Sequence, residues 1–567
     1  MRKWAASAVL AAFVLALLVR VSPLMRFPVW GSDAGEYYRI ARDLVASGHV
    51  STAYLGWGVT YPYFPGMFFV VGAIAFGGAE LPAALNLAIP ALGAFVVVPV
   101  FLIAAPRLRD DRPAVFAAAL VAVAMPHAYA TSHAIPATLG DLLVFTALAM
   151  ALKARTDPRW LLLFGPTVPA LVITHHLSAY FLAVALLLAL VLRAMLMPTL
   201  PLTALAREVA VFGYVLGSAL AFWFVYGGPW RNLIVAEASV QPWWLLFVAL
   251  GAGLLGVAIA IAARRRRPVR YRPTVPDLRH GTVAYALGLG SMLSVVALGT
   301  LVIVPGTAIL LSPVVPLMFL PLFVLLAFSA TGRKALDLSR DGIDVTGWFL
   351  AFVLSAVAGI FVGPRVLVPY RHLEYIVVPL AILAGVGFIG TVDLARPRRG
   401  LRAAAIATAA GLLAASAAAA IPPPVVLANW NEGMAPQAFD APYWARTNIR
   451  GGALVAADHR DSTLLFGFGN ASATWDTARL TLLAPTFRDA QSEMASVSSP
   501  SGARRVEFVL IDADAERGAQ LFPWEPAYPL RGEAVAKFSE PPFLKVFDSG
   551  FAQVYWVNWG CGAGPCS

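Results

Sequence analysis

Apolar runs of about twenty residues recur from residue 5 to about residue 421, and they limit what this chain can fold into more than any other feature. A helix needs roughly 20 mostly apolar residues to cross the hydrocarbon core of a bilayer. Hydrophobic residues make up 59% of the chain and charged residues only 13%, which excludes a soluble protein of 567 residues. The sequence therefore predicts a polytopic α-helical membrane protein with about 13 transmembrane helices.

The N-terminal run begins behind Arg2 and Lys3. We predict that it is a retained first span rather than a cleaved signal peptide, because many further spans follow it. The later predicted spans are 82–104, 114–130, 139–153, 159–174, 177–196, 208–226, 243–263, 281–304, 307–328, 346–363, 374–391 and 402–421. The apolar segment 63–78 is short and bounded by proline and glycine, so we expect a helix that lies at the membrane interface.

Arginine and lysine concentrate in short loops between alternate predicted spans, at 106–113, 153–159, 264–280, 331–340 and 396–402. Cytoplasmic loops of membrane proteins carry this excess of basic residues. The pattern predicts a multi-pass protein of the cell membrane, with its N-terminus in the cytoplasm and its C-terminal domain outside. The net charge of +11 then reflects topology, and we expect no nucleic-acid partner.

The region after residue 424 is polar and rich in turns, which predicts a C-terminal domain over 425–567. The transmembrane domain then covers 1–424, with a first outer loop over 23–81. The predicted strands of the C-terminal domain are 452–458, 505–514 and 543–558. The last of these is predicted to be a hairpin that turns at 548–550. Helical stretches between the strands complete a small extracytoplasmic α/β domain.

Some features of the C-terminal domain leave alternatives open. Cys561 and Cys566 form a disulfide loop if this end lies outside the cytoplasm, and stay free thiols if it lies inside. Asn470 begins an Asn-Ala-Ser sequon, and the sequence does not decide whether it is modified. The segment ADHRDS (457–462) gathers two aspartates and a histidine. We interpret it as a solvated turn, against the alternative of a metal or acceptor site.

The segment VWGSDAGEYYRIARDL (29–44) follows the first span and carries carboxylates and arginines on the predicted outer side. On a helix, Asp33 and Glu36 share one face and can meet one substrate or one cation. The alternative is a capping box, in which Ser32 or Asp33 caps the helix and Glu36 reaches back to it. A lipid-phosphate-linked substrate needs this chemistry: cations for the leaving phosphate and a carboxylate base for the attacking group.

Further polar side chains lie at the predicted outer ends of later spans. Asp141 begins one span, where it faces protein or water, or caps the helix. His175 and His176 are adjacent, so on a helix they point about 100° apart and cannot chelate one ion neatly. Phosphate binding, metal ligation and interfacial packing stay open for them. Arg365 and Arg371 suit bidentate binding of phosphate oxygens, against the alternative of snorkelling to lipid headgroups.

With these motifs the chain resembles the membrane-embedded glycosyltransferases of the GT-C superfamily, which include protein O-mannosyltransferases, lipid A aminoarabinose transferases and the catalytic subunit of oligosaccharyltransferase. The family's acidic residue in the first outer loop matches Asp33 in GSDAGEYY, and YPYFPGMFF (61–69) is similar to the interfacial segment that follows. A second family acid matches Asp141 in SHAIPATLGD, where His133 replaces an arginine. A late outer arginine matches Arg371 in YRHLEYIVVPLAILAG.

The resemblance implies that Asp33 is the general base that activates the acceptor, with Asp141 and Glu36 assisting. It also implies that Arg371, with Arg365, binds the donor phosphate. From their position among the outer polar residues, we assign His175 and His176 to the same phosphate site. Some branches of the superfamily need a divalent metal and others do not, so Mg²⁺ or Mn²⁺ at Asp33 and Asp141 stays open. Two further candidates lie in the same motifs: His133 and Tyr375.

Departures from the oligosaccharyltransferase pattern shape the functional hypothesis. The Trp-Trp-Asp acceptor motif is missing from the C-terminal domain, and the outer loop at 304–309 is a tight turn. We therefore expect transfer of a single sugar from a polyprenyl-phosphate donor to a protein, glycan or lipid acceptor. The alternatives are oligosaccharyl transfer to protein, transport of a lipid-linked sugar and a non-catalytic scaffold. The enzyme hypothesis requires Asp33, Asp141 and Arg371 to converge on one outward cavity.

Overall fold

The computed structural model describes these residues: 2–108, 110–197, 200–232, 251, 279–304, 307–332, 342–362, 367, 369–499, 502–522 and 525–560. Within them, nine helices are long and apolar enough to cross a membrane, in agreement with the predicted helical membrane protein. Several predictions fall wholly or mostly outside the described residues: the span 243–263, the loops 264–280 and 331–340, Arg365, Cys561 and Cys566. The expected total of about 13 spans therefore stays a prediction.

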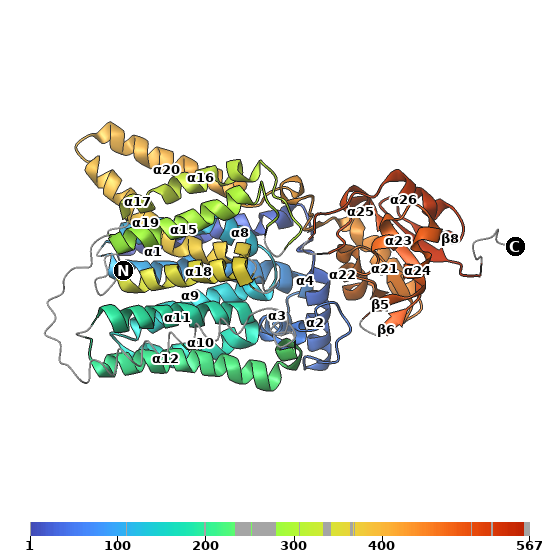
Figure 1. Ribbon diagram of the computed structural model, residues 1–567, viewed down its shortest axis with the longest axis horizontal. Coiled ribbons are helices and arrows are strands. Elements are labelled where there is room, and N and C mark those ends of the chain that lie inside the picture. Colours follow the sequence, from blue (N-terminus) through green and yellow to red (C-terminus); the bar gives the residue numbers. More distant parts are fainter. Residues whose placement is uncertain are drawn as a thin grey trace. The chain divides into compact units, whose positions relative to one another are not determined.

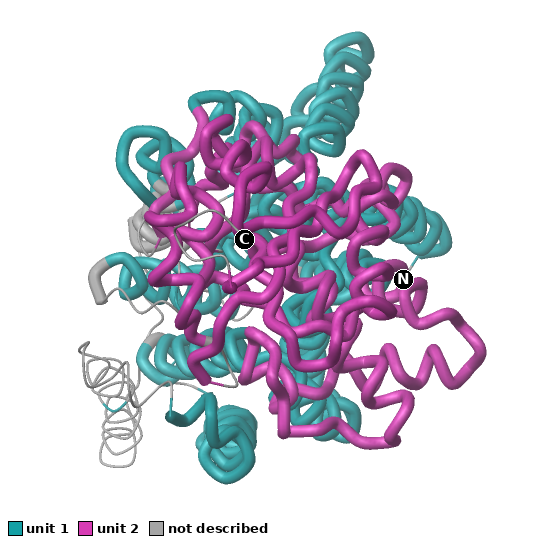
Figure 2. Tube along the Cα trace, turned by 90° about the vertical axis from the view of Figure 1, so that its right-hand side faces the viewer, with its two compact units in different colours: residues 1–21, 90–306, 313–421 teal, residues 22–89, 307–312, 422–567 magenta. Residues whose placement is uncertain are grey.

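The chain divides into two compact units, which Figure 2 shows in different colours. Unit 1 comprises Met1–Val21, Pro90–Gly306 and Pro313–Ile421. Unit 2 comprises Ser22–Ile89, Thr307–Ser312 and Pro422–Ser567. The predicted first outer loop, 23–81, thus belongs to the same compact unit as the C-terminal region.

Unit 1 is built from helices, and α10, α11 and α12 run side by side in it (Figure 1). Its described helices are α1 (Lys3–Val21), α5 (Ile89–Ala94), α6 (Val97–Ala104), α7 (Asp111–Val123), α8 (Met125–Ala130), α9 (Pro136–Lys153), α10 (Leu161–Thr174), α11 (His176–Leu196), α12 (Leu202–Ala221), α15 (Arg279–Leu298), α16 (Val315–Ala327), α17 (Ser329–Gly332), α18 (Gly342–Val362), α19 (Leu373–Leu394) and α20 (Arg399–Ala419). Helix α19 is apolar on all sides and buried along most of its length. A Cβ atom at Gly387 of α19 would overlap the carbonyl of Phe328, so glycine permits this close helix packing.

Prolines decide where several helices of unit 1 begin and end. The predicted span 114–130 is interrupted at Ala124, because Pro126 stands in the first turn of α8 and cannot continue the hydrogen bonds of α7. The predicted span 307–328 becomes helical only at Val315, with Pro316 in its first turn. The predicted start was wrong because the span was predicted from hydropathy alone, and hydropathy does not depend on the backbone N–H that proline lacks.

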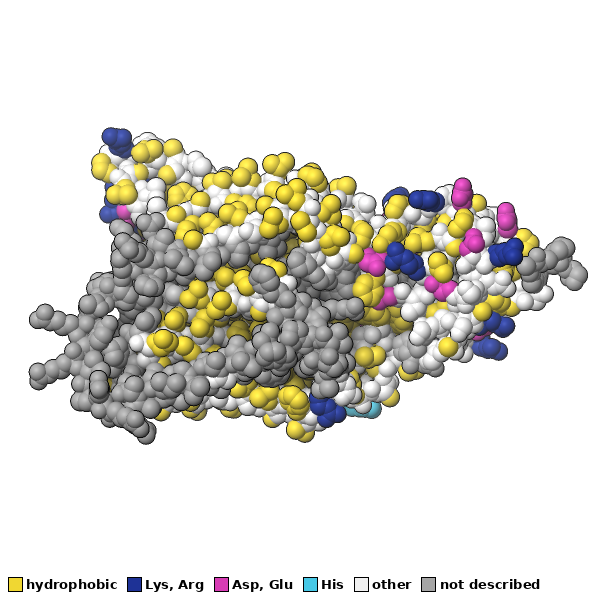
Figure 3. Space-filling model, viewed as in Figure 1, with side chains coloured by type: hydrophobic (Ala, Val, Ile, Leu, Met, Phe, Trp, Pro, Cys, Tyr) yellow, Lys and Arg dark blue, Asp and Glu magenta, His cyan; other side chains and the backbone are white. Residues whose placement is uncertain are grey.

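The surface of unit 1 is apolar where it can be seen. In Figure 3 the visible side chains of its helices are mostly hydrophobic, whereas Lys, Arg, Asp and Glu are spread over unit 2. Large apolar residues such as Leu317 and Leu320 of α16 and Leu401 of α20 are exposed. Helices that satisfy their own backbone groups and expose apolar side chains suit a lipid environment.

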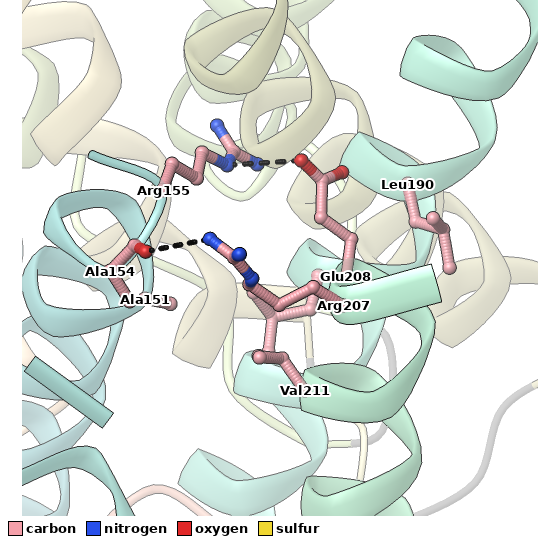
Figure 4. A pocket seen from close by; sticks show the side chains of 8 residues that line it. Ala151, Ala154, Arg155, Leu190, Arg207, Glu208 and Val211 are labelled. Atoms are coloured by element: carbon pink, nitrogen blue, oxygen red, sulfur yellow. Dashed lines mark hydrogen bonds and ion pairs between the residues drawn. The ribbon is translucent and has the colours of Figure 1, made fainter. Parts of the chain in front are cut away.

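Charged side chains join the ends of α9, α11, α12 and α18 in unit 1. Arg155 pairs with Glu208 at 3.2 Å and also with Asp344. Arg193 lies 2.9 Å from the same Glu208 carboxylate. Arg155, Arg207 and Glu208 line a small cavity of about 30 Å³ (Figure 4). Arg155, in the basic loop 153–159 that indicates topology, therefore also has structural partners.

Unit 2 contains a five-stranded sheet in the order β4-β3-β7-β9-β8. Its strands are β3 (Leu454–Ala456), β4 (Ser472–Ala473), β7 (Val506–Asp512), β8 (Phe543–Asp548) and β9 (Ala552–Val557). Strands β4, β3 and β7 are parallel, and β9 is antiparallel to both of its neighbours. The predicted hairpin is present as β8 and β9, and Gly550 has the positive φ of 79° that its turn requires.

The helices of unit 2 complete the mixed α/β structure expected of the C-terminal region. They are α2 (Ala34–Ser47), α3 (Gly66–Phe76), α4 (Leu81–Ala83), α21 (Asp440–Asn448), α22 (His459–Gly467), α23 (Arg479–Leu483), α24 (Phe487–Ala495), α25 (Ala513–Gly518) and α26 (Gly532–Ala536). A separate two-stranded hairpin pairs β5 (Val497–Ser499) with β6 (Gly502–Arg504). Helix α3 lies within the segment predicted to form an interfacial helix, 63–78.

The first loop packs directly on the C-terminal region within unit 2. Strand β1 (Val29–Trp30) pairs antiparallel with β2 (Gly433–Met434), and α2 packs against α22. The two helices touch through backbone atoms, since a Cβ at Gly35 would overlap the Thr463 carbonyl and one at Gly467 would overlap that of Gly35. This close approach holds the start of α2 against the second half of α22.

Candidate functional site

Asp33, the acidic residue that the sequence motif pointed to, stands at the N-terminus of α2. It occupies the N-cap position, but its side chain makes no cap hydrogen bond. Its Oδ1 atom lies 2.9 Å from Nε2 of His459, and its Oδ2 atom accepts a hydrogen bond of 3.1 Å from the hydroxyl of Tyr61. The capping role proposed as the alternative is therefore not what holds this carboxylate.

His459 lies between two carboxylates at the start of α22. Its Nε2 faces Asp33, and its Nδ1 is 2.7 Å from Oδ1 of Asp476. Asp458 caps the helix by accepting from the backbone N–H of Asp461, which fixes where His459 begins the first turn. Because both ring nitrogens face carboxylate oxygens, the doubly protonated imidazolium is the form that satisfies them. We call these three residues the Asp33–His459–Asp476 cluster.

The electrostatics of His459 follow from this geometry. Burial by itself lowers the pKa of His459, but the hydrogen bonds and charges of Asp33 and Asp476 raise it well above its usual value. The indole N–H of Trp57 donates to the other oxygen of Asp476, and the Trp57 ring stands edge-on to the imidazole at 4.9 Å. His459 is fully buried, whereas the side chain of Asp33 keeps 24% of its surface exposed. Asp33 is thus the member of the cluster open to a reacting group.

Alkaline pH is expected to destabilise unit 2 through His459. Because the folded pKa is raised, its stabilisation is complete below the unfolded value of about 6.5 and is lost as pH rises through the folded pKa. We expect the melting temperature of the full chain in detergent to fall on the alkaline side, and to fall less in His459→Gln. The exposed His49→Gln variant should follow wild type. If the melting temperature of His459→Gln falls with rising pH as steeply as that of wild type, His459 is not charged in the folded protein.

Glu36 is buried and binds its own loop rather than facing outward with Asp33. It accepts a hydrogen bond from the hydroxyl of Tyr54 and from the backbone N–H groups of Trp57 (3.1 Å) and Gly58 (3.4 Å). No capping box forms, because this carboxylate is engaged by the loop. Burial raises the pKa of Glu36 to about 7, against the lowering by these hydrogen bonds. Glu36 thus fixes the loop that carries Trp57, and its fully buried side chain is not open to substrate.

Replacing Glu36 by Gln is expected to remove a pH dependence of stability. The folded pKa lies near 7 against an ordinary 4.5, so the wild type loses stability as pH rises through about 7. A shift of this size corresponds to about 3 kcal/mol between acidic and alkaline buffer. The melting temperature of Glu36→Gln should equal that of wild type in acidic buffer and exceed it in alkaline buffer. Glu80→Gln, which changes an exposed carboxylate, is the control. A Glu36→Gln variant that is less stable than wild type in alkaline buffer would contradict the raised pKa of Glu36.

The segment 457–462 is not the solvated turn that the sequence predicted. Asp458, His459, Arg460 and Asp461 are each at most 2% exposed. Arg460 lies 2.9 and 2.8 Å from the two oxygens of Asp512, so its guanidinium offsets the buried carboxylates. The prediction failed because a run of charged residues suggests solvent, whereas here the charges pair within the fold.

Asp141 lies inside unit 1 on α9 and is 1% exposed. It does not cap this helix, which begins at Pro136 after Ile135. The hydroxyl of Tyr375 donates to Asp141, and lies 2.8 Å from the hydroxyl oxygen of Ser178. That oxygen is in turn 2.7 Å from Nδ1 of His175. Two predicted residues, Asp141 and His175, are therefore joined through a third, Tyr375, by a continuous chain of hydrogen bonds.

Other polar residues surround Asp141 that the sequence motifs did not point to. Arg20 is fully buried near the end of α1, and its Nε donates to the hydroxyl of Thr131 at 2.8 Å. It also interacts electrostatically with Asp141. The ring of His127 is buried, with Nδ1 3.7 Å from Asp141. A lone arginine in an apolar span was the available signal for Arg20, since an intramembrane charge needs a partner.

Arg371 lies in a short 3₁₀ turn, η9 (Pro369–His372), just before α19. It interacts electrostatically with His175, His176 and Glu374. His175 caps α11 by accepting from the backbone N–H of Ser178, so it has a structural role too. The ring of His176 lies against the ring of Trp230, with ring centroids 3.8 Å apart and the two planes tilted by 41°. The predicted phosphate-binding residues Arg371, His175 and His176 thus gather in unit 1.

His133 is buried and follows α8. Its Nδ1 lies 2.9 Å from the carbonyl oxygen of Tyr129, and the two rings meet edge to face at 4.8 Å. The carbonyl of His133 accepts from the hydroxyl of Thr138 on α9. These contacts place His133 in the connection between α8 and α9.

The described residues contain no group of three or more His, Cys, Asp or Glu side chains that could hold a metal ion. Next to Asp33, the imidazolium of His459 already supplies a positive charge between two carboxylates. This donor set does not fit a divalent cation, so no step proposed below depends on one. Asp33 and Asp141 belong to different compact units. A metal shared by them, and their convergence with Arg371, stay predictions.

Comparison with known proteins identifies the fold. No protein-family model and no curated protein matches the sequence. Among solved structures, the oligosaccharyltransferase AglB from Archaeoglobus fulgidus, in complex with an inhibitory peptide and a dolichol-phosphate, has a TM-score of 0.57 at 14% identity, over 98% of this chain and 74% of that chain. An oligosaccharyltransferase of the same organism in the apo form has a TM-score of 0.58 at 15% identity, over 100% and 76%.

A further structure of the A. fulgidus oligosaccharyltransferase, in complex with Zn and sulfate, has a TM-score of 0.54 at 14% identity, over 97% of this chain and 73% of that chain. The likeness covers nearly the whole of this chain in all three cases. It confirms the predicted GT-C resemblance at the level of the fold.

Proposed function

We propose that the protein is a membrane glycosyltransferase that moves a sugar from a polyprenyl-phosphate-linked donor to an acceptor on the outer face of the membrane. The likeness of fold to AglB supports the enzyme class, and the candidate spans support a membrane location. The observation that carries the proposal is the setting of Asp33. Its partly exposed carboxylate is held by His459 and Tyr61, at the position of the superfamily's first-loop acid.

Asp33 is the proposed general base. Its carboxylate accepts the proton of the acceptor hydroxyl or amide while that oxygen or nitrogen bonds to the anomeric carbon of the sugar. The bond between the anomeric carbon and the phosphate oxygen breaks, and the phosphate leaves with the electron pair. Because His459 and Tyr61 both hold Asp33, its carboxylate is oriented before the acceptor arrives.

Positive charge for the leaving phosphate is assigned to Arg371, with His175 and His176 beside it. A guanidinium binds phosphate oxygens through two parallel hydrogen bonds and stabilises the charge that develops as the bond breaks. Asp141 is buried and bonded to Tyr375, so we assign it a supporting place behind the histidines rather than a contact with substrate.

The direct test is transfer of a single labelled sugar. Membranes that contain the protein are incubated with a series of radiolabelled polyprenyl-phosphate sugars, and lipid-linked label is separated from acceptor-linked label. Transfer that requires the protein supports the proposal. If no donor yields acceptor-linked label, and labelled lipid instead changes leaflet in sealed vesicles, the protein is a transporter.

Transfer of an oligosaccharide to protein is a second candidate, favoured by the likeness to AglB, which was solved with an inhibitory peptide. A fluorescent peptide with an Asn-X-Thr sequence, mixed with lipid-linked oligosaccharides, distinguishes the two. A glycosylated peptide would favour the second candidate, whereas single-sugar transfer without peptide labelling favours the first.

A further inference from the structure

Three arginines and two carboxylates meet at one end of the helices of unit 1. Arg155 and Arg193 both pair with Glu208, at 3.2 and 2.9 Å, and both also pair with Asp344. Arg207 stands next to Glu208 in the second turn of α12. We call these five residues the Arg207 cluster. Together they carry three positive charges and two negative ones, so the cluster has room for one more anion.

Arg207 differs from the other two arginines in its contacts. Within the part of the chain that the structure describes, its guanidinium has no carboxylate at ion-pair distance, and Nη1 lies 3.4 Å from the carbonyl oxygen of Ala154 (Figure 4). Arg207 lines the cavity of about 30 Å³ together with Arg155 and Glu208, and the residue is exposed. A guanidinium has five N–H donors. Most of those of Arg207 can therefore serve an acceptor from outside the chain.

The helix that carries Arg207 has an open apolar face. Ala210 and Tyr214 follow Arg207 by one and two turns on the same side of α12, and both are exposed. An added Cβ at Gly217, further along this side, would meet no atom within 4 Å. In the span Leu202–Tyr226 only 17% of the most apolar stretch is buried. A helix with so much exposed apolar surface suits contact with acyl chains.

The depth of the cluster in the membrane is indicated by Lys153 and Trp160. Nζ of Lys153, at the end of α9, lies 4.3 Å from the centre of the Trp160 ring, which precedes α10. Tryptophan is enriched where a membrane meets water, at the level of the lipid headgroups. Arg155 follows Lys153 by two residues, in the loop 153–159 that is predicted to be cytoplasmic. The cluster therefore lies at the level of lipid phosphates.

We propose that the Arg207 cluster binds the headgroup phosphate of an anionic phospholipid, whose acyl chain lies along α12. A guanidinium binds phosphate oxygens through two parallel hydrogen bonds, and basic pockets between the cytoplasmic ends of membrane helices suit anionic headgroups. A cavity of about 30 Å³ holds a group the size of one water molecule, so it admits a phosphate oxygen while the rest of the headgroup stays outside. The exposed apolar side of α12 favours a lipid over a soluble anion, which would leave that surface uncovered.

The bound phosphate would join two helices that are linked here by one long contact. Arg207 belongs to α12, and the carbonyl of Ala154 directly follows α9. A phosphate between Arg207 and Arg155 would neutralise the excess positive charge and hold the two helix ends together. The site lies wholly within unit 1, and it involves neither Asp33 nor the proposed transfer of sugar.

The test counts lipids retained by the full-length protein in detergent, by native mass spectrometry. Wild type is titrated with dioleoylphosphatidylglycerol, which carries a net negative charge, and separately with dioleoylphosphatidylcholine, which has the same acyl chains and no net charge. We expect one phosphatidylglycerol to be retained in preference to phosphatidylcholine. Arg207→Gln should weaken retention of phosphatidylglycerol about tenfold, because it removes charge-assisted hydrogen bonds to the phosphate.

The matched control is Arg159→Gln. Arg159 is an exposed arginine in the same basic loop as Arg155, and its side chain does not line the cavity. This variant removes the same charge from the same end of the bundle, so it should retain phosphatidylglycerol as wild type does. An equal loss in both variants would assign the retention to general attraction by basic residues and would overturn the site.

Two further outcomes would also overturn the proposal. Equal retention of the two lipids by wild type would show that the headgroup charge is not recognised, and this measurement needs no variant to fold. Inorganic phosphate is the arm that tests a soluble anion. If it raises the melting temperature of wild type as much as phosphatidylglycerol does, and Arg207→Gln abolishes both effects, the cluster binds a free anion rather than a lipid.

Discussion

An Asp33→Asn variant is expected to lose about a thousandfold in sugar transfer and to keep its fold. The amide still fits beside His459 and Tyr61, but it cannot take the proton of the acceptor, and a positioned base typically contributes 10²–10⁴-fold. The measurement is the initial rate of acceptor labelling from a polyprenyl-phosphate sugar, with wild type and variant matched for amount. Melting temperature in detergent checks that unit 2 remains folded.

The control for Asp33→Asn is the same substitution at Asp43 on α2. Asp43 pairs with Arg39 at 2.8 Å, and its side chain is 44% exposed. Exposed ion pairs contribute little, so Asp43→Asn should keep its activity within about twofold of wild type. Full activity in Asp33→Asn would remove Asp33 as the base, and an equal loss in both variants would assign the effect to α2 as a whole.

Transmembrane helices could be predicted from the sequence where their signal is local. The predicted span 177–196 became α11 (His176–Leu196), because a long apolar run is sufficient by itself to favour a spanning helix. The breaks were not predicted, since the effect of Pro126 depends on which backbone N–H it removes. The hairpin of β8 and β9 was predicted because segments of alternating apolar and polar residues flank a local turn that contains Gly550.

The partners of the site residues could not be predicted in the same way. Asp33 was singled out by its motif, but His459 lies 426 residues further along the chain. Nothing in the local pattern of ADHRDS distinguishes a buried helix start from a solvated turn. His459 became a site residue only because α2 and α22 pack at backbone contact, which depends on tertiary structure.

The contact between α2 and α22 leads to the second large effect, in a Gly35→Ala variant. The added Cβ would overlap the carbonyl oxygen and carbon of Thr463, which are backbone atoms and cannot rotate away. The helices must therefore separate, and overpacking of this kind costs about 1–3 kcal/mol. Separation also draws Asp33, two residues before Gly35, away from His459. A misplacement of about 1 Å at a reacting group can cost roughly a hundredfold in rate.

Gly35→Ala is thus expected to lower both the melting temperature and the rate of sugar transfer, the latter by about a hundredfold. The matched control is Gly451→Ala in the same unit, where an added Cβ meets no atom within 4 Å, and both quantities should stay close to wild type. The comparison separates positioning from chemistry, because Gly35→Ala alters no polar group of the Asp33–His459–Asp476 cluster and changes only where Asp33 lies relative to His459. If transfer stays at the wild-type rate although stability falls, the packing of α2 on α22 stabilises unit 2 without aligning Asp33, and His459 is then a structural partner rather than part of the reaction.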